Sequence, residues 1–230
     1  MDKMQHMVYG IGNPLIDIIV SVDEQDVIDL GIHKGTMALI GRERMEELLQ
    51  LSKNRKTTYS CGGSCPNTII ALASLGVPAT LAGKIGNDEN GTIYRNRLVS
   101  LGVQDELVTT DKEMTGSTVI LITPDSERSM NTFLGANRLY EESDVRESTV
   151  AAADFFHFTG YMWDTQSQQG AIKKALSIAK KNNTTISFDL ADPFAVGRYR
   201  EPFLSLIKES GDIVFANREE ARILSDNYAP

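Results

Sequence analysis

The chain has 230 residues, enough for one large or two small domains, and its 41% hydrophobic content suffices for a sizeable core. Its 23 basic residues are outnumbered by 31 acidic ones, and the net charge of −8 argues against a nucleic-acid-binding surface. No apolar run is long enough to span a bilayer, and the N-terminal residues MDKMQHMVYG lack the hydrophobic stretch of a secretory signal, so we expect a cytoplasmic protein without a membrane partner.

Apolar runs that alternate with amphipathic stretches predict an α/β fold. In chain order the expected strands are 8–12, 16–22, 36–40, 80–85, 119–122, 130–134, 155–159, 186–189 and 213–216. The expected helices are 23–30, 42–52, 67–75, 90–101, one that begins at Ser143, 166–181, 201–209 and 218–225. Short apolar strands between helices are typical of a parallel sheet that is covered on both faces.

Two stretches interrupt this alternation because they contain mainly strands. Residues 15–41 and 106–135 have β-like runs, and the polar segment 123–128 between two of these runs predicts a hairpin turn. We expect the two stretches to form a small second sheet. Residues 1–14, 42–105 and 136–230 would then form the α/β body.

Polar and aromatic side chains follow the predicted parallel strands at their carboxyl ends, where ligands bind in such sheets. Asn13 and Asp17 follow the first strand, and Tyr161 and Trp163 follow the strand 155–159. Asp and Asn are also common turn residues, so turn chemistry alone explains part of this pattern. It explains Trp163 less well.

The stretch GGSCPNTIIALASLGVPATLAGKIGNDENG, which begins at Gly62, resembles the first signature of the ribokinase-like (PfkB-type) carbohydrate kinases. Its glycine pair, Asn67 and the later glycines have the spacing of that family. GIGNPLIDI at 10–18 is similar to the opening of the adenosine-kinase branch, and NREEA at 217–221 resembles the family's N-x-x-E motif. The strings TGSTVILI, ERSMNTFLGAN and SFDLADPF also resemble that branch, so the likeness covers essentially the whole chain.

This resemblance implies a ribokinase-like three-layer α/β/α sandwich with a mostly parallel sheet, in which 15–41 and 106–135 form a β lid over the substrate. It implies phosphoryl transfer from ATP, with Mg²⁺, to the hydroxymethyl group of a nucleoside or sugar, with adenosine favoured. It also suggests a homodimer formed through the lid.

The resemblance further implies roles for individual residues. The implied substrate-binding residues are Asn13, Asp17, Leu39, Gly62, Gly63, Asn67, Tyr161 and Trp163. Asp17 would accept hydrogen bonds from the ribose hydroxyls, and Leu39 would cover a nucleobase. Arg128 would stabilise charge on the transferred phosphoryl group. Asn217 and Glu220 would bind near the nucleotide phosphates and organise magnesium, through water molecules.

Each of these roles competes with a structural explanation. Asp17 could cap a turn, Glu220 could complement the dipole of a helix, and Arg128 could be a solvated charge on a hairpin. Trp163 could belong to the core or to an interface instead of a substrate wall.

The family's second signature, D-T-x-G-A-G-D, does not occur in this sequence. That signature supplies an anion hole and the aspartate that accepts the proton of the substrate hydroxyl. We therefore expect the substrate-binding half of such a kinase, truncated at the C-terminal side. Two hypotheses remain: an ATP-dependent kinase for a nucleoside or for a ribose- or fructose-type sugar, and a nucleoside- or sugar-binding module without catalysis.

Overall fold

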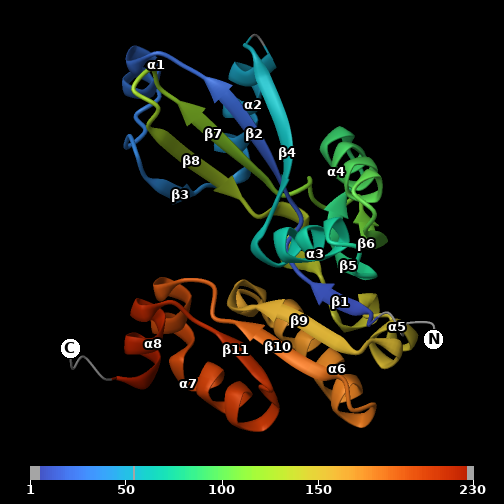
Figure 1. The fold of residues 1–230 in the computed structure, drawn as a ribbon. Helices are drawn as coiled ribbons and strands as arrows, with labels where there is room; N and C mark the ends of the chain where they lie inside the picture. The colour runs from blue at the N-terminus through green and yellow to red at the C-terminus, as the bar shows by residue number, and fades with distance from the viewer. Residues whose placement is uncertain (1–5, 54, 227–230) are drawn as a thin grey trace.

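The computed structural model of the chain describes residues 6–53 and 55–226, and its strands form two sheets (Figure 1). The first sheet is entirely parallel, with the order β11 (Ile213–Phe215), β10 (Thr185–Asp189), β9 (Phe155–Thr159), β1 (Val8–Ile11), β5 (Ala79–Gly86), β6 (Gln104–Thr110). The second sheet is mixed, with the order β3 (Met37–Leu39), β8 (Arg128–Phe133), β7 (Ser117–Ile122), β2 (Leu15–Ser21), β4 (Thr57–Gly62).

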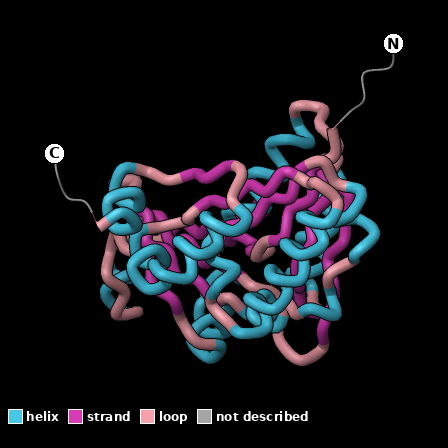
Figure 2. Tube along the Cα trace, turned by 90° about the horizontal axis from the view of Figure 1, so that it is seen from below, coloured by secondary structure: helices cyan, strands magenta, loops and turns pink. Residues whose placement is uncertain are grey.

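Helices cover both faces of the six-stranded sheet, which confirms the expected layered α/β architecture. One face is covered by α3 (Ser64–Ser74) and α4 (Glu89–Ser100). The other is covered by α5 (Glu147–Ala152), α6 (Gln166–Lys181) and α7 (Pro193–Ser210), and helices lie in front of the strands when the molecule is seen from below (Figure 2). The remaining helical segments are α1 (Glu24–Asp29), α2 (Arg42–Lys53), α8 (Arg218–Ser225) and the short 3-10 turns η1 (Gly135–Leu139), η2 (Glu142–Asp144) and η3 (Gly160–Trp163).

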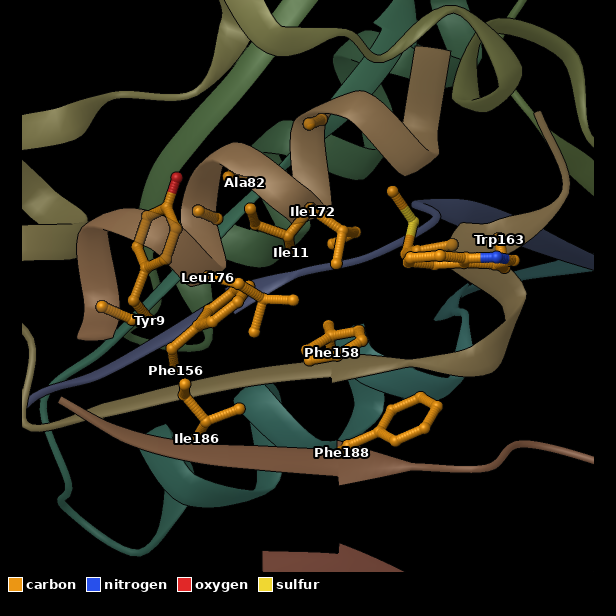
Figure 3. Close-up of a cluster of buried hydrophobic side chains, with 14 of the residues drawn as sticks. Tyr9, Ile11, Ala82, Phe156, Phe158, Trp163, Ile172, Leu176, Ile186 and Phe188 are labelled. Atoms are coloured by element: carbon orange, nitrogen blue, oxygen red, sulfur yellow. The ribbon is translucent and has the colours of Figure 1, made fainter. Parts of the chain in front are cut away.

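Aromatic side chains form the core between the six-stranded sheet and α6 and α7 (Figure 3). The rings of Phe158 and Phe188 stack with their centroids 4.8 Å apart, and Phe156 stacks on Phe158 at 5.4 Å. Phe203 of α7 meets Phe188 edge to face at 5.1 Å. Each such buried ring contributes roughly 1.5–3 kcal/mol relative to an exposed one, so this face fixes the position of α7.

A second core joins the five-stranded sheet to the layer of α3 and α4. It contains Ile16 and Ile18 of β2, Leu48 of α2, and Ile69 of α3. Gly10 and Gly12 let α3 approach β1 closely, because a Cβ at Gly10 would lie 2.5 Å from a side-chain carbon of Ile69 and a Cβ at Gly12 would lie 2.7 Å from the Cβ of Cys65. The N-terminus of α3 is thereby held beside the carboxyl end of β1.

Two strands lie in a different sheet from the one that the sequence predicted. The sequence placed 1–14, 42–105 and 136–230 in the α/β body, and 15–41 and 106–135 in the second sheet. β4 lies within 42–105 but pairs with β2 in the five-stranded sheet. β6 lies mostly within 106–135 but pairs with β5, because α4 returns the chain to form a parallel β-α-β unit. β4 was missed because its exposed edge position allows polar residues, TTYSCG, in place of an apolar run.

Two helix starts also differ from expectation. α7 begins at Pro193 instead of residue 201, and α5 begins at Glu147, after the separate turn η2 that contains Ser143. Across the described residues no helix is both long and apolar enough to cross a membrane.

Candidate functional site

A cavity of about 680 Å³ opens between the five-stranded sheet and the carboxyl ends of the parallel strands. Its lining includes the following residues that the sequence singled out: Asn13, Asp17, Leu39, Gly63, Asn67 and Tyr161. These residues come from the five-stranded sheet, from the segments that follow β1 and β9, and from the N-terminal end of α3. A molecule in the cavity would therefore contact segments that are distant in sequence.

Strand register aligns Asp17 with Leu39 on the cavity face of the five-stranded sheet. Asp17 pairs with Thr118, Thr118 with Thr132, and Thr132 with Leu39. Directly paired residues point to the same face, so these four side chains form one row across the sheet. The hydroxyls of Thr118 and Thr132 are 3.2 Å apart. The row has a carboxylate at one end and an exposed leucine at the other.

The glycine pair allows protein groups to approach at the Asp17 end of the cavity. A Cβ at Gly62 would lie 2.6 Å from both carboxylate oxygens of Asp17. Gly63 has φ +103, and a Cβ there would lie 2.3 Å from the backbone oxygen of Asn13. Glycine is therefore required at position 63 by the backbone of Asn13, and at position 62 it leaves room for the Asp17 carboxylate, whereas close approach to a sugar stays a prediction.

No donor from the described residues makes a hydrogen bond to the Asp17 carboxylate. Burial raises the pKa of Asp17, and the positive charge of Arg128 offsets part of that rise. A half-buried carboxylate without hydrogen-bond donors retains its full capacity to accept them from a ligand.

Arg128 lies on the same face of the five-stranded sheet as Asp17 but outside the cavity lining. Its register partner is Ile122, which in turn pairs with Ser21, four residues beyond Asp17 on β2. At about 3.3 Å per residue, this offset places Arg128 about 13 Å along the sheet from the Asp17 row. Its side chain is exposed and does not line the cavity, although its charge is near enough to act on the carboxylate of Asp17.

Asn13 is fixed by a residue that the sequence analysis missed. Its Oδ1 accepts a hydrogen bond of 2.9 Å from Nε2 of Gln168, which also donates to the carbonyl of Asn137. Gln168 is buried in the first turn of α6, three residues after the capping Thr165. The T-x-x-Q pattern at 165–168 is a capping-box signal that could have drawn attention to it.

Tyr161 and Trp163, which both follow β9, have different environments. Tyr161 lines the cavity, and burial, with a smaller effect of Asp192, raises the pKa of its hydroxyl. Trp163 is 5% exposed, is not part of the cavity lining, and packs edge to face on Phe203 at 6.4 Å in the core. The expectation that Trp163 forms a substrate wall therefore disagrees with its position.

The N-terminal half of α7 forms a cavity wall that the sequence analysis did not anticipate. Asp192 caps this helix by accepting a hydrogen bond of 2.7 Å from the backbone of Ala195. Phe194, Arg198 and Tyr199 then line the cavity. The dipeptide Asp192-Pro193 is a typical capping residue followed by a first-turn proline, a signal that could have located the start of α7.

Asn217 and Glu220 form a reciprocal capping box at the start of α8, outside the cavity lining. The backbone N–H of Asn217 donates to one Glu220 carboxylate oxygen at 2.9 Å, and the side-chain Nδ2 of Asn217 donates to the other at 2.6 Å. The backbone N–H of Glu220 in turn donates to Asn217 Oδ1 at 2.9 Å. Glu220 is 4% exposed. No group of three or more His, Cys, Asp or Glu side chains in the described parts of the chain is placed to hold a metal ion. These two residues alone therefore do not fit a direct magnesium site.

Comparison with known proteins gives related kinases. The chain is 30% identical over 220 residues to an adenosine kinase from Dictyostelium discoideum, covering 93% of this chain and 63% of that protein. It is 31% identical over 188 residues to an ATP-dependent ribose-1-phosphate kinase from Halopiger xanaduensis, covering 81% and 60%. The chain thus spans less than two thirds of the length of these relatives.

A solved structure of adenosine kinase from Sinorhizobium meliloti is similar to the whole described fold. The TM-score is 0.84 at 36% identity, and the alignment covers 98% of this chain and 69% of that one. The family model for pfkB carbohydrate kinases matches residues 35–227. With most of its length matched in this way, the chain belongs to the pfkB family of carbohydrate kinases.

Proposed function

We propose that this chain forms the substrate-binding part of an ATP-dependent kinase that phosphorylates the hydroxymethyl group of a nucleoside, with adenosine as the first candidate. The observation that carries this proposal is the row from Asp17 to Leu39. It offers at one end a carboxylate that accepts no hydrogen bond from the described residues, and apolar surface at the other end. A nucleoside has the matching order of groups, a ribose diol and then a flat base.

In this proposal Asp17 accepts hydrogen bonds from the two vicinal ribose hydroxyls. A carboxylate has two oxygens and only accepts, so it can bind two neighbouring hydroxyl donors at once. Asn67, on the first turn of α3, adds a side-chain contact to the sugar, and Asn13 is held in place for the same purpose by Gln168. Leu39 and Tyr161 cover the base from opposite walls.

The phosphoryl donor in this proposal is ATP, as in the name of the Halopiger relative. The backbone of Arg128 lies about 13 Å along the five-stranded sheet from Asp17, so in this proposal that sheet moves toward the body as a lid and carries Arg128 to the transferred phosphoryl group. Magnesium would be bound through water, since both carboxylate oxygens of Glu220 accept hydrogen bonds from Asn217. Pairing of two copies through the exposed edge residues of β3 is a further part of the proposal.

A second candidate is a nucleoside- or sugar-binding module without turnover. It would use the same cavity, because Asp17, Asn67 and Leu39 are each assigned to binding of the sugar or of the base.

Calorimetric titration with adenosine and with ribose, together with an ATP-dependent phosphorylation assay on the same preparation, separates these candidates. Binding with turnover supports the kinase, and binding without turnover supports the module. If adenosine does not bind to a chain that melts cooperatively, the proposed function is wrong.

A further inference from the structure

Arg198 is the single cationic side chain among the described residues that line the cavity. It lies on α7, four residues after Phe194, and both residues line the cavity. Residues four apart on a helix are neighbours on one face, so a guanidinium and an aromatic ring are presented together. They stand on the wall opposite the five-stranded sheet, which carries Asp17 and Leu39.

Within the described residues the Arg198 guanidinium has no carboxylate partner. Two carboxylates of the cavity lining have other contacts: Asp164 pairs with Arg138 at 3.0 Å, and Asp192 caps α7. The recorded contact of the Arg198 guanidinium is with the ring of its neighbour Tyr199, at 5.3 Å. Its hydrogen-bond donors are therefore available to a ligand.

The chemistry of this group restricts what it can recognise. Guanidinium only donates hydrogen bonds, and its planar fork fits two adjacent acceptors. The 6-oxopurines present such a pair in O6 and N7, whereas adenine presents an acceptor at N7 but a donor at its six-position amino group. Arg198 is exposed at the cavity wall, so water can satisfy its donors when adenine is bound, and the discrimination comes from the matched pair of hydrogen bonds that a 6-oxopurine adds.

We propose that Arg198 is a specificity-determining residue that donates to the acceptor edge of a 6-oxopurine base, so that the site accepts inosine-type nucleosides in addition to adenosine. This inference rests on the proposed nucleoside site. It adds that the tolerance for a six-position carbonyl depends on one side chain of α7.

The test is calorimetric titration of the full chain with inosine and with adenosine, for the wild type and for Arg198→Met. Methionine keeps much of the apolar stem and lacks donors. We expect the variant to bind inosine at least about fivefold more weakly, the lower end of the discrimination that a good arginine–base pair gives, and adenosine less than about twofold more weakly. Lys208→Met is the matched control, because it removes an exposed charge from the same helix outside the cavity.

The outcomes distinguish this inference from the proposed function. If the wild type binds adenosine but not inosine, or if Arg198→Met weakens both nucleosides equally, the role of Arg198 is wrong and the nucleoside site stands. If the wild type binds neither nucleoside while it melts cooperatively, the proposed function fails and this inference fails with it.

Discussion

The substitution Gly62→Ala tests whether the position of Asp17 sets the affinity for a nucleoside. The new Cβ would lie 2.6 Å from both carboxylate oxygens, well inside van der Waals contact. The carboxylate is the end of a side chain that faces a cavity, so it would rotate away while the backbone stays in place. A hydrogen bond to a charged group contributes about 1.5–3 kcal/mol, so losing one of the two ribose contacts should raise the Kd for adenosine about 10- to 150-fold.

Two further glycine variants make this experiment specific. Gly41→Ala is the control, because a Cβ there has no neighbour within 4 Å, and both affinity and melting temperature should stay at wild-type values. Gly63→Ala should instead destabilise the fold. The φ of +103 at this position suits glycine and alone costs another residue about 1–3 kcal/mol, and the new Cβ would also meet the backbone of Asn13 at 2.3 Å. Calorimetry gives the Kd and thermal unfolding gives the stability. A Gly62→Ala protein that binds adenosine as tightly as the wild type would refute the reasoning.

Four other predictions concern single side chains. Because burial raises the pKa of Asp17 in the folded state, its charge destabilises the fold above that raised pKa and not below the ordinary value of 3.8. Asp17→Asn should therefore raise the melting temperature at neutral pH while it abolishes adenosine binding. As the pH is lowered, the affinity of the wild type for adenosine should fall with a midpoint above pH 3.8, because the carboxylate becomes protonated. Trp163→Phe should lower the free energy of unfolding in urea by roughly 1–3 kcal/mol and leave the Kd for adenosine unchanged. A raised Kd with an unchanged free energy of unfolding would instead show that Trp163 contributes to binding. Glu220→Ala should lower the free energy of unfolding by about 1 kcal/mol and increase the rate of amide hydrogen exchange in α8. An unchanged exchange rate would contradict the capping role of Glu220. Ile213→Lys should reduce self-association in light scattering because it places a charge on an exposed edge strand, whereas Leu75→Lys, at a more exposed position at the C-terminal end of α3, should have no effect.

The parts of the site that the sequence predicted are those where local backbone chemistry leaves a pattern. Gly62 and Gly63 stand out because two adjacent glycines mark a backbone that other groups approach closely, and Asn13 and Asp17 stand out because polar residues follow an apolar strand. These signals are local, so they survive without knowledge of the tertiary structure. The layered fold was predictable for the same reason, since strand and helix periods are read over a few residues.

The parts that were missed depend on pairing between distant segments. Thr118 and Thr132 line the cavity because β7 pairs with β2 and β8 pairs with β7, each in one register, and a register between distant strands is not visible in either strand alone. The separation of Tyr161 from Trp163 depends on how η3 packs against Phe203 of α7. A sequence pattern places both aromatic residues after β9, but only tertiary packing decides which of them faces the cavity.

The cavity lies between two cores, and this arrangement explains why binding and stability should respond to different substitutions. Asp17 and Leu39 stand on a sheet whose interior belongs to the core of α2, α3 and α4, whereas Phe194 and Arg198 stand on α7, which is anchored in the aromatic core around Phe188. Neither wall needs the other to bury its apolar side chains. Polar substitutions that face the cavity should therefore change affinity with little loss of stability, and a ligand that contacts both walls at once should raise the melting temperature by joining them.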